Sequence, residues 1–206
     1  KMEKKLVKVI KGLLKTNQFR MHPNGFYQLD IGNNSRLHIW PPEKQEHQKN
    51  YNPIHDHTFS FDSFILIGHL KHYEYDYMED EDGEYQMYNV IPVEGNHTIM
   101  EPTGKFINII KSKEMHLLPG SRYTFEKHKF HESVNEKGVL TATIMKKTQQ
   151  GYDLRARIIG IRNHDPDDNS FDRTKIDQDK AHMYLEDVLA NTGKNILYGA
   201  HKFIKK

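Results

Sequence analysis

The segment NPIHDHTFSFDSFILIGHL, residues 52–70, places His55 and His57 one residue apart, directly before an apolar run. Alternate side chains of a β-strand point to the same face, so two imidazoles at this spacing are able to share one metal ion. The chain has 14 histidines in 206 residues, and by composition alone a pair at any one fixed short spacing is expected about once. The spacing of the two histidines alone therefore does not indicate a metal site, and the neighbouring residues must be considered.

The residues around the pair predict how it is placed. Pro53 suits the first residue of an edge strand, and residues 58–60 are few enough to turn the chain into a second strand that begins at Asp62. On that strand Asp62 shares a face with Phe64 and Leu66. We therefore expect Asp62 to lie beside the histidines, either as a fourth ligand or as the acceptor for an imidazole N–H.

A third nitrogen ligand is expected from a distant strand. In LLPGSRYTFEKHKFHESVN, residues 117–135, a Pro-Gly turn leads into a strand that carries His131, and Asn135 follows four residues later. His128 lies three residues before His131, so in a regular strand the two side chains point to opposite faces and only one of them can bind the metal. Of the two, His131 is the predicted ligand.

Composition limits the chemistry and the partners. The chain has no cysteine, which excludes disulfides, thiolate ligands and a cysteine nucleophile, so nitrogen and oxygen must hold any metal. Its 30 basic and 28 acidic residues give a net charge of +2, which leaves no overall field to attract nucleic acid or an anionic membrane. Lysines interrupt the N-terminal apolar residues and no run of about 18 apolar residues is present, so we expect a cytoplasmic protein.

The hydrophobic pattern changes twice along the chain. Apolar residues at spacings of three and four predict an amphipathic helix within residues 2–19, and DQDKAHMYLEDVLANTG belongs to a predicted helical extension over residues 176–206. Between them, residues 24–160 alternate short β-rich runs with turn signals, a pattern typical of an all-β sandwich or barrel. We expect a single domain over residues 1–206. The predicted strands are 25–31, 36–40, 62–77, 85–92, 96–101, 106–111, 115–118, 121–126, 130–134, 139–147 and 153–159.

The run PIHDHT, the apolar strand that closes on a glycine, and the downstream Pro-Gly turn with its histidine resemble the two motif regions of the cupin superfamily. Within it, the chain is most similar to the cysteine dioxygenase family, whose first motif has a similar Ile-His-Asp-His-Thr run. Residues 36–70 and 117–147, roughly a third of the chain, carry the likeness. The resemblance implies a cupin-type double-stranded β-helix, or jelly-roll barrel, with an N-terminal helix and a C-terminal helical extension. It also implies iron held by three histidines, which match His55, His57 and His131.

The chain departs from the cysteine dioxygenase pattern at several positions. That family often carries a cysteine just after the histidine pair, cross-linked to a tyrosine, whereas Phe61, Asp62 and Ser63 stand there and Lys147 lies near the position expected for the tyrosine. Where the family has an arginine for the substrate carboxylate, this chain has Gln28. These departures argue against cysteine as the substrate. Asp62 also stands roughly where many cupins have a glutamate.

Five side chains are the candidates for binding and orienting a substrate: Arg36, His38, Arg122, Tyr123 and His128. Arg36 and His38 share one face of the predicted strand SRLHIW, which either lines the cavity or points to solvent. Tyr123 and His128 lie on and just after the strand SRYTF. An arginine in the cavity would bind a carboxylate or a phosphate through two parallel hydrogen bonds.

Together these features predict a metal-dependent enzyme, similar to the non-haem iron dioxygenases, that acts on a small polar or anionic molecule. Three neutral imidazoles leave the charge of a divalent ion uncompensated, which favours Fe(II) with an anionic substrate; coordination by Asp62 would make zinc, nickel or manganese equally plausible. One alternative is a non-catalytic cupin that binds a small ligand or a protein partner. Another is a sugar isomerase or epimerase that uses Asp62 as a ligand. The resemblance also implies a homodimer formed through sheet edges or terminal helices.

Overall fold

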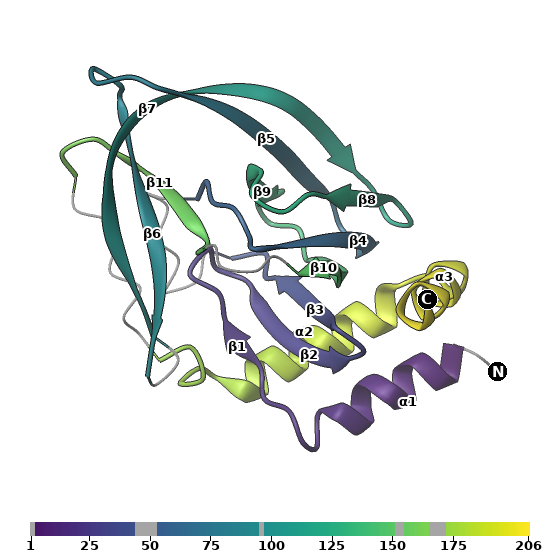
Figure 1. Cartoon of the computed structure of the whole chain (residues 1–206). Coiled ribbons are helices and arrows are strands. Elements are labelled where there is room, and N and C mark those ends of the chain that lie inside the picture. Colours follow the sequence, from purple (N-terminus) through teal and green to yellow (C-terminus); the bar gives the residue numbers. More distant parts are fainter. Residues whose placement is uncertain (1–2, 44–52, 95–96, 151–154, 165–171) are drawn as a thin grey trace.

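Two antiparallel β-sheets, with three helices against one of them, make up the described part of the chain (Figure 1). The computed structural model describes residues 3–43, 53–94, 97–150, 155–164 and 172–206. The six-stranded sheet has the order β1 (Arg20–Met21), β2 (Tyr27–Gly32), β3 (Ser35–Trp40), β10 (Thr141–Gln150), β4 (Phe59–Ile67) and β8 (Arg122–Phe125). The five-stranded sheet has the order β11 (Arg157–Ile161), β6 (Tyr85–Val93), β7 (His97–Leu117), β5 (Leu70–Glu79) and β9 (Phe130–Asn135).

The six-stranded sheet separates an apolar core from a polar face. On β3, Leu37 and Ile39 are fully buried in the core that the helices complete. Arg36 and His38 alternate with them and face the other way, into a pocket. On β10, Ile144 belongs to the same core. One sheet thus supplies both the main core and a wall of the candidate site.

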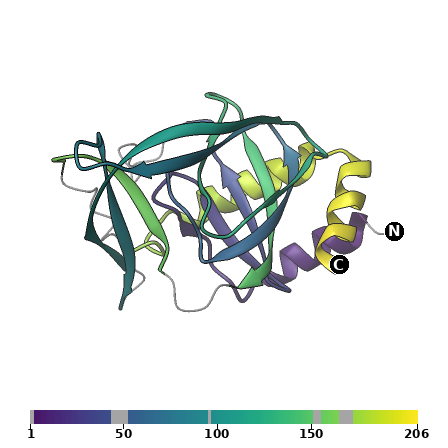
Figure 2. The same cartoon turned by 45° about the horizontal axis from the view of Figure 1, so that its top comes forward.

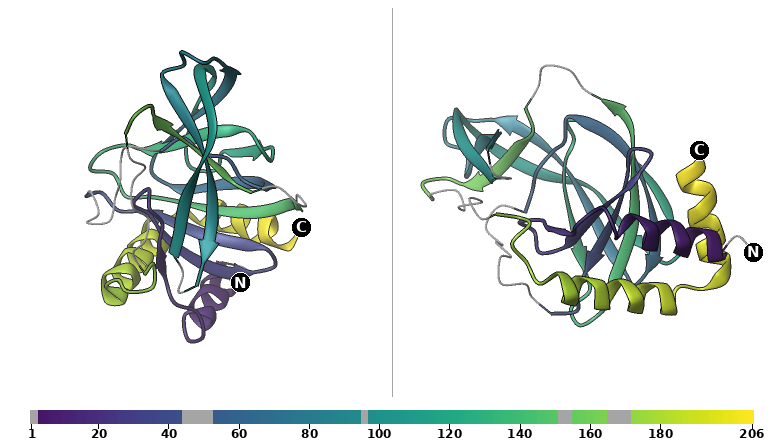
Figure 3. Two further views of the ribbon diagram at one scale, coloured as in Figure 1. Left: turned by 60° about the vertical axis from the view of Figure 1, so that its left-hand side comes forward. Right: turned by 90° about the horizontal axis from the view of Figure 1, so that it is seen from below.

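Three helices cover the apolar face of this sheet, as Figures 1 and 3 show: α1 (Glu3–Leu13), α2 (Gln178–Asn191) and α3 (Lys194–Lys205). Helix α2 begins after Asp177, whose carboxylate accepts a hydrogen bond from the Lys180 N–H at 3.0 Å. Helix α1 is shorter than the predicted range 2–19, because a turn at residues 14–16 leads the chain towards β1. Among the described residues, no helix has the length and apolar character needed to pass through a lipid bilayer.

The long strands β5 and β7 arch over the six-stranded sheet on the side away from the helices (Figure 2). The sequence predicts three separate strands between residues 96 and 118, whereas the structure has the single strand β7. Strand β6 pairs with the first half of β7, up to Ile107, and β5 pairs with its second half, from Ile107 to Leu117, so the Pro-Thr-Gly signal within β7 produces a register shift against β6 rather than a break.

The predicted strand 62–77 is divided at Gly68, where β4 ends and β5 follows. Gly68 has φ +82°, a left-handed conformation, and a Cβ at this position would lie 2.2 Å from Thr141 Oγ1. Glycine is therefore required for the chain to turn against the start of β10. The chain crosses here from the six-stranded to the five-stranded sheet. The described strands form two separate sheets, so the closed barrel of the prediction is not observed among the described residues.

Candidate metal centre

The segment His55-Asp56-His57 runs between the two edge strands of the five-stranded sheet, β9 and β11. His55 pairs with His131 through two backbone hydrogen bonds, from His55 N to His131 O (3.0 Å) and from His131 N to His55 O (2.9 Å). On the opposite side, Asp56 N donates to Arg157 O at 3.0 Å. The sequence predicts a regular strand here, whereas the structure has isolated bridges on both sides of His55.

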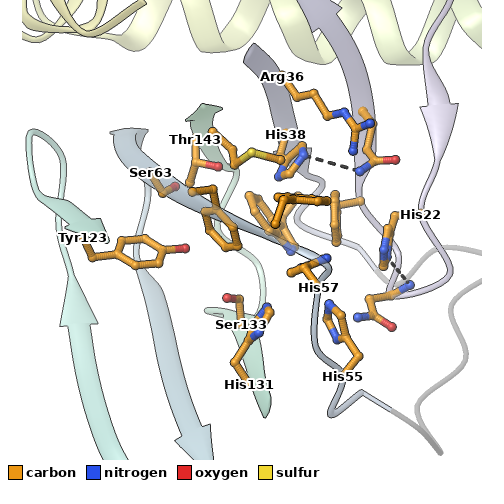
Figure 4. A pocket seen from close by; sticks show the side chains of 17 residues that line it. His22, Arg36, His38, His55, His57, Ser63, Tyr123, His131, Ser133 and Thr143 are labelled. Carbon is orange, nitrogen blue, oxygen red and sulfur yellow. Dashed lines mark hydrogen bonds between the residues drawn. The ribbon is translucent and has the colours of Figure 1, made fainter. Parts of the chain in front are cut away.

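Three imidazoles converge where this segment faces β9 (Figure 4). The ring centroids lie 4.9 Å apart for His55 and His57, 4.5 Å for His55 and His131, and 5.0 Å for His57 and His131. One nitrogen of each ring lies within 4.8 Å of the other two. A common point then exists within about 2.8 Å of all three nitrogens, compared with about 2.0–2.1 Å for a metal–imidazole bond. Side-chain movements of less than about 1 Å would complete a three-histidine site.

Backbone carbonyls orient two of the three rings. His55 Nδ1 lies 2.8 Å from Pro53 O, and His131 Nδ1 makes a longer contact of 3.5 Å with Lys129 O. In both cases the carbonyl belongs to the residue two positions upstream. A ring that donates from Nδ1 keeps the lone pair of Nε2 for a metal.

Burial keeps the three rings neutral. It lowers the pKa of His55, and it lowers the pKa values of His57 and His131 well below the ordinary histidine value, with neighbouring histidines adding to the effect. Neutral imidazole is the form that binds a metal, so protons do not compete for these ligands near pH 7.

The triad forms part of the wall of a pocket of about 60 Å³ that both sheets line. Arg36 and His38 come from β3 and Tyr123 from β8, so three of the five predicted substrate-binding residues reach this pocket, whereas Arg122 and His128 are not part of its lining (Figure 4). Apart from the histidines, Arg36 is the only ionisable basic side chain in the described lining, and no carboxylate is part of that lining. A divalent ion here would have no carboxylate beside it to offset its charge.

Arg36 is held at the edge of the pocket. Its Nε donates to Asp30 Oδ1 at 3.1 Å, and the side chains of Arg36 and Asp30 are 28% and 61% exposed. Because the carboxylate is mostly in water, this ion pair is weak and leaves the rest of the guanidinium available to an anion.

The other two predicted substrate-binding residues in the pocket, His38 and Tyr123, are uncharged near neutral pH. Burial, and then the Arg36 charge, lower the pKa of His38 to about 3, and His38 Nε2 lies 3.4 Å from Gln28 Nε2. Burial raises the pKa of Tyr123, against the opposing effect of hydrogen bonds with Ser63 and Ser133. Tyr123 therefore keeps a phenolic proton that it can donate.

Asp62 does not lie beside the histidines, which corrects the prediction. Strand β4 begins at Phe59 instead of at Asp62, and the alternation of the histidine segment continues into it: Phe61 and Ser63 face the pocket and Asp62 faces away. Asp62 Oδ1 instead accepts a hydrogen bond from Thr124 Oγ1 at 2.8 Å. The three clustered ligands within the described residues are histidines alone.

His128 also lies elsewhere than predicted, since it is not among the residues that line the pocket. Its backbone is left-handed, with φ +62°, and its N–H donates to His57 O at 2.8 Å. Its Nδ1 lies 4.0 Å from Asp56 Oδ2. His128 thus contacts the His55–His57 segment on the side away from the pocket.

His22 is a pocket residue that the sequence reasoning did not select. Its ring stacks on Phe26 with centroids 4.3 Å apart and lies 6.0 Å from the His55 ring. The Asn24 N–H donates to His22 Nδ1 at 3.1 Å, so the neutral ring carries its proton on Nε2. No spacing to another histidine marks His22 in the sequence, and its place in the pocket depends on the turn before β2.

Comparisons with known proteins do not assign a family. No protein-family model matches the chain, and no curated protein matches it. Among solved structures, the hydroxypropylphosphonic acid epoxidase from S. wedmorenis is similar at a TM-score of 0.37 and 11% identity, covering 64% of this chain and 56% of its own. A structure of FeII HppE has a TM-score of 0.34 and 12% identity, and the match covers 65% of this chain and 57% of the other.

Another similar structure is that of Drosophila melanogaster CENP-C bound to CAL1, with a TM-score of 0.35 and 10% identity; the match covers 70% of this chain and 94% of the other. This chain therefore spans little more than half the length of the first two matched structures. Scores and identities at this level are too low to assign either the fold or an activity.

Proposed function

We propose that this protein is a metal-dependent enzyme of the cupin type that binds a divalent ion, with Fe(II) preferred, through His55, His57 and His131. Its activity would be that of a non-haem iron dioxygenase-like oxidoreductase on a small polar or anionic molecule. The observation that carries this proposal is the convergence of three neutral imidazoles on one point of a pocket wall. Nucleic acid and membranes are not part of the proposal.

The donor set fits such an ion. Three nitrogen ligands on one side of a metal leave further positions open to substrate and dioxygen, as in other non-haem iron sites. Bound Fe(II) would supply the redox chemistry, while the protein supplies orientation and a shielded cavity. Asp62 faces away from the site, so the reading as a sugar isomerase with a carboxylate ligand loses its support.

The other pocket residues favour an anion as substrate. A divalent ion with three neutral ligands keeps its full charge, and Arg36 adds a second positive group at the pocket edge. Tyr123, which stays protonated, is placed to donate a hydrogen bond to an oxygen of the bound molecule. Phe26, Trp40 and Phe61 complete the lining and keep water from part of the site.

Dioxygen uptake by protein reconstituted anaerobically with Fe(II) tests the activity. The panel contains thiols, amino acids and phenols, and the matched control is the His57→Ala variant treated in the same way. We expect uptake that depends on one class of compound and is lost in the variant. Binding of a compound without dioxygen uptake would instead favour a ligand-binding cupin and contradict the enzymatic proposal.

A further inference from the structure

The side chain between the two histidines points away from the pocket and is buried. Asp56 is 1% exposed, because alternation along the segment turns it to the face opposite His55 and His57. Its Oδ1 accepts a hydrogen bond from the Arg157 backbone N–H at 2.6 Å. Its Oδ2 accepts from Arg157 Nε and lies equally close to Arg157 Nη2, 2.7 Å in each case. Both carboxylate oxygens are therefore bound by one residue of β11.

Arg157 is itself held in place on the far side of this pair. Its guanidinium lies over the Phe130 ring, with Cζ 4.7 Å from the ring centroid, and its Nη1 donates to Tyr77 Oη at 3.4 Å. Its Nη2 also donates to His128 O at 3.3 Å. The arginine thus contacts β5 and the residues that lead into β9 as well as its own strand.

We infer that the Asp56–Arg157 pair is a positioning clamp for the metal ligands. This inference rests on the proposed function, because the clamp concerns the geometry of the same three-histidine site. Asp56 fixes the segment to β11, and the paired backbones of His55 and His131 fix the segment to β9. The clamp therefore sets the position of His55 and His57 relative to His131.

His128 completes the clamp through its backbone. Its N–H donates to His57 O, and its carbonyl accepts from Arg157 Nη2. His128 makes these two bonds with a left-handed backbone at φ +62°, a conformation that few non-glycine residues adopt. One residue thus links the second ligand to the arginine that holds the segment.

Such a clamp acts on the metal without touching it. Replacing a group that orients a metal ligand typically weakens metal binding by about 10- to 100-fold. The isosteric change Asp56→Asn keeps the shape and removes the charge, and Arg157→Lys keeps the charge but cannot reproduce the fork of donors. Both changes leave the three histidines intact.

Co(II) binding tests the clamp, since the visible spectrum of the ion reports its coordination geometry. Affinity is measured by chelator competition for the wild-type protein and for the Asp56→Asn and Arg157→Lys variants. Leu185→Ala is the matched control, because it destabilises the helix-covered core on the other face of the sheet. We expect at least about tenfold weaker binding and an altered spectrum for Asp56→Asn, a smaller loss for Arg157→Lys, and wild-type values for Leu185→Ala.

The outcomes separate this inference from the proposed function. Wild-type protein that binds no Co(II) overturns the proposed function and the clamp together. Equal affinities and identical spectra for the wild type and Asp56→Asn overturn the clamp alone. If Asp56→Asn does not fold, Arg157→Lys decides in the same way, with a loss of affinity expected and wild-type behaviour contradicting the inference. A loss of affinity in Leu185→Ala as large as that in Asp56→Asn also overturns it.

Discussion

His38 illustrates how the pocket keeps its imidazoles without protons. Its ring lies 4.9 Å from the Phe26 ring and 5.8 Å from the Trp40 ring, and the Arg36 charge is near it, so both burial and a positive neighbour oppose its protonation. In the unfolded chain the same ring takes up a proton near pH 6.5. Acidification therefore favours the unfolded state by way of this residue.

The His38→Gln variant should lose part of this acid sensitivity. Between the unfolded pKa of about 6.5 and the folded pKa of about 3, only the unfolded state binds the proton, so the stability contributed by neutral His38 falls as pH falls through this window. From pH 7 to pH 5, the free energy of unfolding of the wild type should fall by on the order of 2 kcal/mol more than that of the variant. Urea denaturation at both pH values measures the difference. An identical pH dependence in both proteins would contradict the buried, neutral state of His38, and His116→Gln at an exposed position is the control.

Arg36 should act on bound anions rather than on the metal. Replacing Arg36 by glutamine removes the charge at the pocket edge, and we expect azide to bind the Co(II)-loaded protein about tenfold more weakly. Titration followed in the visible spectrum gives the Kd. Arg162→Gln is the control, since Arg162 donates to the carbonyls of Glu81 and Gly83 outside the pocket. An unchanged Kd in Arg36→Gln would show that the guanidinium does not reach the anion.

At the residue scale, local alternation was enough to predict which histidines lie together, while their role as metal ligands stays a prediction. His55 and His57 share a side because they are two residues apart, and the neighbouring strand pattern pointed to His131. The prediction misplaces Asp62 because it assumes a turn at residues 58–60, whereas β4 begins at Phe59 and continues the alternation of the histidine segment, which turns Asp62 away from the pocket. His22 enters the pocket through a turn whose course no spacing in the sequence reveals.

At the scale of elements, the connection from β4 to β5 depends on one glycine. Gly68 combines a left-handed backbone with close approach to the backbone and hydroxyl of Thr141. Gly104 has a similar φ of +76° within β7, but no atom lies within 4 Å of the place where its Cβ would stand. A side chain at Gly104 would therefore cause backbone strain alone, whereas one at Gly68 would cause both strain and steric overlap.

Gly68→Ala should destabilise the protein far more than Gly104→Ala. We expect a loss of at least about 3 kcal/mol in the free energy of unfolding for Gly68→Ala, from strain and overlap together, and about 1 kcal/mol for Gly104→Ala from strain alone. Chemical denaturation of both variants measures these values. Equal losses would mean that Thr141 moves aside without cost.

The elements themselves were predictable to different degrees. Apolar spacing indicated the helical segments at both ends, because these helices have one apolar face against the sheet. The prediction divides β7 after residue 101, since Pro102 and Gly104 are turn signals in isolation, and again after residue 111, where the polar run Ser-Lys-Glu interrupts the apolar pattern. Pairing along β5 and β6 overrides those signals, and such long-range pairing is not encoded in a local window.

At the scale of the whole molecule, one face of the six-stranded sheet forms the main core and the other face lines the pocket. Alternate residues of β3 and β10 pack against the helices on one side and line the pocket on the other. The pattern of many short strands predicted a two-layer or barrel β-fold, and the structure has two antiparallel sheets. How the sheets are arranged could not be predicted, because their order follows from contacts between segments far apart in the chain.

This arrangement brings together ligands from residues 55 and 131, and it leads to the central claim that the site binds a metal. Metal content is measured by mass spectrometry on protein purified without a histidine tag, before and after anaerobic reconstitution with Fe(II). We expect stoichiometric metal in the wild type and in His116→Ala, whose altered histidine is exposed and remote from the triad, and loss of the metal in His57→Ala. Absence of stoichiometric metal in the wild type, or equal metal content in His57→Ala, would contradict the account.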